Sequence, residues 1–258
     1  MKGETTMKRY TLLIYMLAIM GWVFAQNPTD EWFVQANTAY NSGDYETAVE
    51  FYEKILATDM ESVPVYYNMG NAYYKMREYP KAIYSYEKAL KLDPSNEEVR
   101  TNLEIANLAI VDKIEPVPQS FIERWWCSLR AMCSSDRWAW WSVAAFALLL
   151  VCLFMFLRSR RVGLRKLGFF MGVFFLIVFA LSVVFAAQLK HAAITQDQAI
   201  IMTPTVTVKS SPSDEGVDLF VLHEGTKVSV LETSNGWNKV RIANGSVGWL
   251  EMDKMLSF

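Results

Sequence analysis

The sequence predicts a multidomain membrane protein with an all-α repeat domain, two transmembrane helices and a small all-β barrel. Three observations predict this fold class. The chain matches itself at a shift of 34 residues near its start, carries two uncharged apolar runs in its middle, and ends in short β-branched segments separated by turn residues. With 258 residues, of which 52% are hydrophobic, only two modest soluble parts remain once the apolar runs are set aside.

Residues 1–25 have the pattern of a signal peptide. Lys8 and Arg9 precede an apolar run that ends at Ala25, where a small residue is suited to cleavage. We expect cleavage after Ala25, and an uncleaved anchor is the alternative. Both interpretations place residue 26 onward outside the cytoplasm.

A helical repeat domain is predicted over residues 26–113. The matching pairs include Asn37 with Asn71, Tyr40 with Tyr74, Tyr45 with Tyr79, Ala48 with Ala82 and Tyr52 with Tyr86. A period of 34 residues with these aromatic and small positions and a closing Pro94 resembles the tetratricopeptide repeat. We expect units at 29–62 and 63–96 and a capping helix at 95–111. Two units fall short of the three usually needed, so we expect stability to depend on the membrane or a partner.

The resemblance implies a groove lined by the first helix of each unit. Such a surface, rich in aromatic and amide side chains, suits an extended peptide or a helix of a partner protein. The alternative is that several of the tyrosines only pack against the next helix. In relatives that clamp a terminal carboxylate, basic residues stand where this chain has Phe33, Glu98 and Asn102, so a carboxylate clamp is not favoured. The candidate partner-binding residues are Phe33, Asn37, Tyr40, Asn41, Tyr67, Asn71, Tyr74 and Lys75.

Residues 114–137 form a proline-containing linker followed by an interfacial segment. Pro116 and Pro118 favour a stiff, extended connection. The residues after it mix large apolar side chains with arginines, which indicates an amphipathic segment on the outer leaflet, and an ordinary loop with membrane-proximal tryptophans is the alternative. Cys127 and Cys133 lie close enough in sequence for a disulfide to be conceivable, although they do not share a helix face.

The apolar runs at 138–157 and 167–188 predict a transmembrane hairpin. Helices of this length match the hydrocarbon core of a bilayer, which is roughly 30 Å thick. Two core helices of a soluble domain are the competing interpretation. The connection at 158–166 holds five basic residues and no acid, and such short loops stay in the cytoplasm. We therefore expect both soluble domains, before residue 138 and after residue 188, to lie outside the cytoplasm.

Residues 196–258 change to β-branched segments with hairpin-type turns at Asn235-Gly236 and Asn244-Gly245. The segments around Val206–Ser213, Leu222–Val228 and Gly236–Arg241 resemble a bacterial SH3-like domain. That family usually has arginine where Lys209 stands and often binds cell-wall peptide. The resemblance implies a binding surface that includes Lys209, Trp237 and Trp249, and the alternative is that the two tryptophans belong to the barrel core.

The sequence indicates neither an enzyme nor a nucleic-acid-binding protein. Residues 26–120 carry 16 acidic and 8 basic side chains, a balance that phosphate backbones disfavour. The two histidines, His191 and His223, have no cysteine in the soluble parts to pair with. Metal-ligand spacing, a phosphate-binding glycine loop and a serine elbow are also missing, so we expect no cofactor and no metal.

The order of the parts resembles the BatE-like proteins of the Bacteroides aerotolerance (Bat) family. Membership would imply a bacterial inner-membrane protein with both soluble domains in the periplasm. It would also imply protein partners among other Bat proteins, some with von Willebrand type A domains, beside a MoxR-type ATPase. The function expected from this resemblance is a non-enzymatic scaffold in an aerotolerance or oxidative-stress complex. The alternative is a peptidoglycan-binding receptor or sensor that acts through its SH3-like domain.

Overall fold

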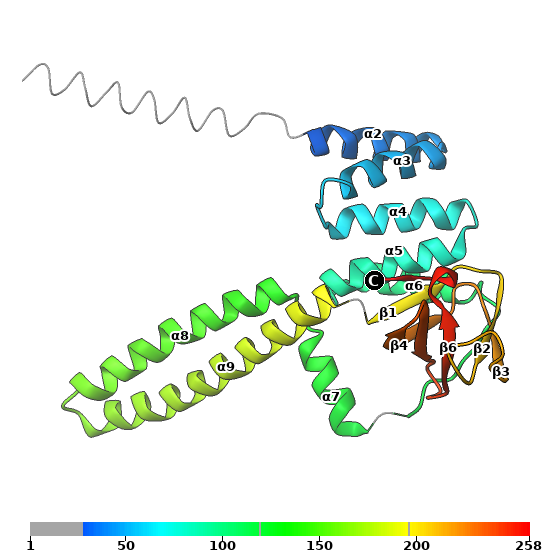
Figure 1. Ribbon diagram of the computed structural model, residues 1–258. Helices are drawn as coiled ribbons and strands as arrows, with labels where there is room; N and C mark the ends of the chain where they lie inside the picture. Colours follow the sequence, from blue (N-terminus) through cyan, green and yellow to red (C-terminus); the bar gives the residue numbers. More distant parts are fainter. Residues whose placement is uncertain (1–27, 119, 196) are drawn as a thin grey trace, which may run out of the picture. The chain divides into compact units, whose positions relative to one another are not determined.

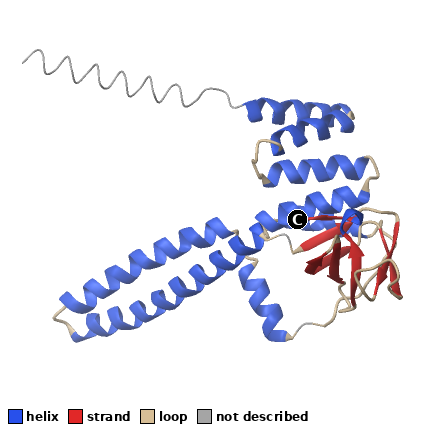
Figure 2. Ribbon diagram, in the orientation of Figure 1, coloured by secondary structure: helices blue, strands red, loops and turns tan. Residues whose placement is uncertain are grey.

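The computed structural model describes residues 28–258 except 119 and 196, so the expected signal peptide at 1–25 lies outside the described residues. The chain forms two compact units, one ending at Glu61 and one running from Ser62 to Phe258, and each is described by itself. Among the described residues every strand belongs to the second unit and follows Ile194 in the chain, and Figure 2 draws these strands in red. The predicted combination of helical repeats, two long apolar helices and an antiparallel sheet is confirmed.

The described part of the first unit is a pair of helices, α2 (Pro28–Ser42) and α3 (Tyr45–Leu56). Between them Gly43 has a φ of 83°, and the side chain of Asp44 caps α3 by accepting a hydrogen bond from the backbone N–H of Thr47 at 3.1 Å. Ala36 and Ala48 are completely buried. These small side chains let the two helices pack closely, as the repeat pattern predicts.

The second unit begins with a similar pair and a third helix. Gly70 on α4 lies so close to α5 that a Cβ atom there would approach the ring of Tyr86 to 2.6 Å. The side chain of Asn96 caps α6 by accepting from the N–H of Val99 at 3.1 Å. The helices of this unit are α4 (Val63–Lys75), α5 (Tyr79–Leu92), α6 (Glu97–Asn107), α7 (Phe121–Arg130), α8 (Ser135–Arg158) and α9 (Val162–Ile194).

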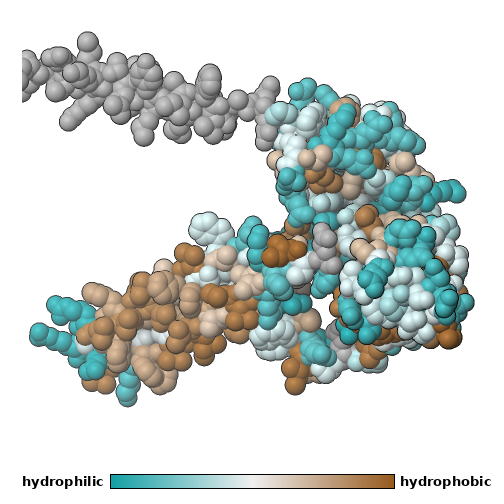
Figure 3. All heavy atoms as spheres, in the orientation of Figure 1, coloured by the Kyte–Doolittle hydropathy of each residue, from teal (hydrophilic) through white to brown (hydrophobic). Residues whose placement is uncertain are grey.

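Helices α8 and α9 form an antiparallel pair whose apolar surface is largely exposed (Figures 1 and 3). Both are long and apolar enough to cross a membrane. Gly168 of α9 packs on the backbone of α8, because a Cβ there would lie 3.0 Å from the carbonyl oxygen of Cys152. The helices extend beyond the predicted 138–157 and 167–188, since helical hydrogen bonding continues through the flanking basic residues. The non-helical connection therefore shrinks to residues 159–161.

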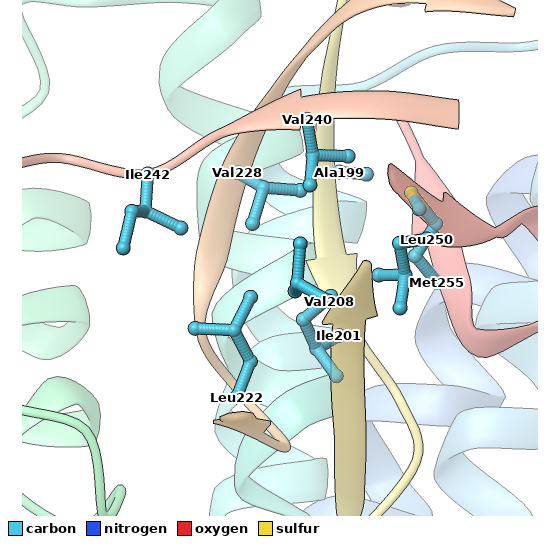
Figure 4. Close-up of a cluster of buried hydrophobic side chains, with 9 residues drawn as sticks. All are labelled: Ala199, Ile201, Val208, Leu222, Val228, Val240, Ile242, Leu250 and Met255. Atoms are coloured by element: carbon cyan, nitrogen blue, oxygen red, sulfur yellow. The ribbon is translucent and has the colours of Figure 1, made fainter. Parts of the chain in front are cut away.

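Seven strands form one antiparallel sheet in the order β3-β2-β6-β5-β4-β1-β7. Side chains from both edge strands, Leu222 on β3 and Met255 on β7, enter the same buried cluster as those of the central strands, so the sheet curves around its core (Figure 4). The strands are β1 (Gln198–Ile201), β2 (Thr205–Lys209), β3 (Asp218–His223), β4 (Lys227–Ser234), β5 (Trp237–Arg241), β6 (Val247–Glu251) and β7 (Met255–Ser257).

The sheet is joined to the helices of its own unit by a half-buried carboxylate. Asp112, which follows α6, accepts hydrogen bonds from the His223 backbone N–H at 2.8 Å and the Thr226 hydroxyl at 2.7 Å, and it pairs with the His223 ring at 2.7 Å. Burial alone would raise the pKa of Asp112, but these hydrogen bonds outweigh it, and the pKa lies below its usual value. Lys227 adds an ion pair with Glu87 of α5 at 2.7 Å.

The first prediction concerns the close approach at Gly70. Gly70→Ala should destabilise the protein by about 1–3 kcal/mol, because the fully buried Tyr86 ring has no free space into which to move. Denaturant unfolding followed by circular dichroism in detergent measures the change. Gly163→Ala is the matched control, since nothing lies within 4 Å of a Cβ there. Equal stability of the two variants would contradict the packing role of Gly70.

The second prediction concerns pH. Because the folded-state pKa of Asp112 is lowered, its contribution is complete above the usual aspartate pKa and is lost as pH falls through the lowered value. Asp112→Asn should reduce stability at neutral pH by about 1.5–3 kcal/mol, and the difference should shrink below about pH 4. Unfolding curves across pH test this, with the exposed Asp214→Asn as control. Parallel pH profiles for wild type and Asp112→Asn would refute it.

Candidate partner-binding surfaces

The first unit carries four predicted groove residues on α2. The hydroxyl of the buried Tyr52 donates a hydrogen bond to the side-chain oxygen of Asn37 at 2.6 Å, and the Phe33 ring lies 6.2 Å from the Tyr52 ring. Tyr40 packs edge-on against Tyr45 at 5.4 Å, while Asn41 is exposed. Asn37 and Tyr40 therefore pack within the unit, and Asn41 faces solvent.

The second unit repeats these contacts on α4. The Tyr86 hydroxyl donates to the side-chain oxygen of Asn71 at 2.7 Å, and the rings of Tyr67 and Tyr86 lie 6.2 Å apart. Tyr74 packs edge-on against Tyr79 at 5.6 Å, as its counterpart does in the first unit. Lys75 is exposed. The repeat therefore preserves the tyrosine–asparagine hydrogen bond and the aromatic pair as well as the small residues.

Helix α6 joins two of these residues into a polar cluster. The Asn102 amide donates to the side-chain oxygen of Asn71 at 2.9 Å and to the Tyr67 hydroxyl at 3.1 Å. The Tyr67 hydroxyl in turn donates to the Glu98 carboxylate at 2.7 Å. We call Tyr67, Asn71, Glu98 and Asn102 the polar cluster. It brings two predicted groove residues together with the two residues of α6 that stand where relatives have basic clamp residues.

The chemistry of the polar cluster follows from its only ionised group. Burial raises the pKa of Tyr67, and the hydrogen bond to the Glu98 carboxylate raises it further, so the phenol stays protonated at neutral pH. Glu98 itself is exposed and carries the negative charge of the cluster. A ligand carboxylate would be repelled there, whereas an amide or a cation would be accepted. The geometry is therefore consistent with the expectation that this groove is not a carboxylate clamp.

On the sheet, strand register places the predicted surface residues side by side. Lys209 of β2 pairs with Trp249 of β6, which pairs with Lys239 of β5, and Trp237 lies two residues before Lys239 on the same face. Their neighbours in sequence, such as Val208 and Val240, point into the core. We call Lys209, Trp237, Lys239 and Trp249 the Trp–Lys face. Lys239, whose ammonium lies 5.8 Å from the Trp249 ring centre, is a member that sequence reasoning missed.

Within the Trp–Lys face, Lys209 holds a neighbouring loop in place. Its ammonium donates to the backbone carbonyl of Asp214 at 2.7 Å and lies 3.4 Å from the Asp218 carboxylate. The loop between β2 and β3 is thereby held against the sheet. Trp237 and Trp249 are half-buried, so each offers part of its ring to solvent. A ligand on the Trp–Lys face would meet two indole surfaces and the Lys239 ammonium.

Two further expectations concern the cysteines and metal binding. Cys127 and Cys133 are free thiols, so the disulfide that their spacing made conceivable is not formed. Across residues 28–258, with 119 and 196 left aside, no group of three histidine, cysteine or acidic side chains is arranged to hold a metal ion.

Comparison with protein families matches three segments of the chain. Residues 32–59 and 63–96 both match the tetratricopeptide repeat, and residues 204–253 match the bacterial SH3 domain. The chain carries two tetratricopeptide repeats and a bacterial SH3 domain. Comparison with curated proteins finds no match. The polar cluster thus lies on a tetratricopeptide repeat and the helix after it, and the Trp–Lys face lies on the SH3 domain.

The third prediction separates the two lysines of the Trp–Lys face. Lys209→Met should speed hydrogen exchange of the Val217 amide by about tenfold, because charged hydrogen bonds that hold the loop are lost. Lys239→Met is the control, since its Glu232 partner is 3.9 Å away and on the surface. Exchange mass spectrometry of the full chain measures both. Equal protection of the loop in the two variants would show that Lys209 does not hold it.

Proposed function

We propose that this protein is a non-enzymatic inner-membrane scaffold. Its tetratricopeptide repeats bind a partner protein, and its SH3 domain binds a protein or the cell wall. The observation that carries the proposal is that two modules of interaction families flank one antiparallel apolar hairpin. Because the two spans run in opposite directions, the chain before α8 and the chain after α9 emerge at the same end.

Contacts at that end support a fixed link between the hairpin and the second repeat. The Arg137 guanidinium at the start of α8 donates to the Asp93 carboxylate at 2.8 Å and to the Ser95 hydroxyl at 2.9 Å. The Lys91 ammonium donates to the carbonyl of Thr195, just after α9. A partner held on the repeat is therefore held near the membrane surface.

The far end of the hairpin supports the orientation that we propose. Residues 158–166 are basic and free of acids, and such short loops remain in the cytoplasm. The modules would then lie in the periplasm. The resemblance to BatE-like proteins supports partners among other Bat proteins, including those with von Willebrand type A domains, and a role in an aerotolerance or oxidative-stress complex.

The fourth prediction tests the scaffold. Glu98→Lys reverses the charge of the polar cluster and should reduce recovery of the partner by at least about tenfold, as loss of a charged contact does. Full-length protein is purified from native membranes in detergent, and the co-purified proteins are quantified by mass spectrometry.

Glu104→Lys is the matched control for this test, because it makes the same charge change at an exposed position elsewhere on α6. A protein that is lost with Glu98→Lys and retained with Glu104→Lys supports the proposal. An identical set of proteins from both variants would show that the polar cluster is not the binding surface. Circular dichroism confirms that both variants are folded.

The second candidate function is a cell-wall receptor, favoured by the Trp–Lys face. Half-exposed indole rings beside an ammonium group suit the sugar and peptide parts of peptidoglycan. The full chain in detergent is sedimented with purified cell wall and compared with Trp237→Ala. If the wild type co-sediments with the cell wall and Trp237→Ala does not, the result supports the receptor function. If the wild type does not co-sediment, the scaffold remains the proposed function. The connection of residues 159–161 is too short for a signalling domain, so this function ranks second.

A further inference from the structure

Helix α7 has one face fixed to the end of the hairpin. The Trp126 ring packs edge-on against Phe185 of α9 at 4.8 Å, and Trp138 packs on the same phenylalanine at 5.0 Å. The Trp138 indole N–H donates to the backbone carbonyl of Arg130 at 3.0 Å, which holds the last turn of α7 beside α8. Phe185 is 2% exposed. One side of α7 therefore continues the packing of the hairpin.

The next face of α7 is apolar and open to solvent. Phe121, Ile122 and Trp125 are 75%, 74% and 55% exposed, and Met132, in the turn after the helix, is 63% exposed. At 100° per residue Phe121, Ile122 and Trp125 share one face of α7, whereas Glu123, Arg124 and Arg130 lie outside it. These three side chains and Met132 in the following turn are called the apolar stripe. A helix with an aromatic stripe beside basic residues has the composition of helices that lie in a membrane interface.

Helix α7 is capped by its own side chains and forms without a partner. Ser120 and Glu123 make a reciprocal capping box, in which the Ser120 hydroxyl accepts from the Glu123 N–H and the Glu123 carboxylate accepts from the Ser120 N–H, both at 3.2 Å. The capping box thus stabilises the helix that presents the apolar stripe. Binding does not have to order the helix first.

We propose that the stripe of Phe121, Ile122, Trp125 and Met132 docks into the lipid of the leaflet from which the hairpin emerges, at the boundary between headgroups and acyl chains. This inference rests on the membrane-spanning hairpin proposed above. It adds a lipid contact outside the two spans, and the partner is a phospholipid surface.

The short connection between α7 and α8 favours lipid as the partner of the stripe. Only residues 131–134 separate α7 from α8, and four extended residues cover at most roughly 15 Å. The end of α7 must therefore stay close to the headgroup layer where α8 enters the membrane. Trp126, next to Trp125 on α7, packs on Phe185 of α9, so the stripe lies beside the end of the hairpin. Tryptophan is the side chain that this layer favours.

Depth-dependent quenching tests the proposal on the full chain. Cys127, Cys133 and Cys152 are replaced, and single cysteines are introduced by Ile122→Cys in the stripe, Arg124→Cys on α7 outside the stripe and Val151→Cys within α8. Each is labelled with an environment-sensitive fluorophore in vesicles of phosphatidylethanolamine and phosphatidylglycerol. Lipids with a spin label near the headgroup or deep in the acyl chain serve as quenchers.

We expect the label at 122 to shift to the blue and to be quenched about twofold more by the shallow than by the deep lipid, since such helices insert only about 5–10 Å. The label at 124 should stay in water, and the label at 151 should be quenched by the deep lipid. If the label at 122 is unquenched while the label at 151 is quenched, the hairpin spans the membrane but α7 does not contact lipid, which overturns the proposal. Equal quenching at 122 and 124 also overturns it, because no face is selected.

Two further outcomes have separate meanings. A blue shift at 122 without lipid quenching would show that protein, such as a partner or a second copy, covers the stripe, and this overturns the proposal. An unquenched label at 151 would refute the membrane-spanning hairpin itself, and the inference would fall with it.

Discussion

A repeat unit cannot bury its outer face with its own two helices, and in the second repeat α6 and the sheet of the same chain together cover that face. Ile83 of α5 is completely buried, and Gly225, in the turn before β4, lies against it. Phe258 packs edge-on against Tyr84 of α5 at 5.7 Å and is 1% exposed. The packing of residues 62–258 into one unit depends on these apolar contacts between α5 and the sheet. The second repeat therefore takes from its own chain the support that we expected from the membrane or a partner.

The parts of the fold that follow from local pattern could be predicted from the sequence. A period of 34 residues was enough to align Ala48 with Ala82, and both are completely buried, because the repeat requires a small residue where its helices approach closely. Two uncharged runs indicated the hairpin, but charge marks where a span meets water and not where a helix ends. The helices accordingly continue past the predicted limits, up to Arg158 and from Val162 onward.

Contacts between distant residues could not be predicted in this way. Asp112 and His223 are 111 positions apart, and no periodicity connects an aspartate in a linker with a turn of the sheet. Lys239 became part of the Trp–Lys face only through strand register, which a single sequence does not reveal. Strand β7 has only three residues and pairs with β1, which lies far earlier in the chain. Neither its length nor a turn signal in the sequence could therefore predict it. In the polar cluster, the hydrogen bonds depend on how α6 packs beside α4.

The bond from Asp112 to His223 has a consequence for biogenesis. One folded body is made from residues 62–112 and 197–258, and the hairpin is an insertion between its two halves. The ribosome synthesises the first half well before the second, and in a membrane both α8 and α9 must be inserted before the second half reaches the compartment of the first. Completion of this body is therefore a late event. Helix α6 is made with the first half, but the part of α5 that the sheet covers, at Ile83 and Tyr84, must until then be shielded by a chaperone or remain bare.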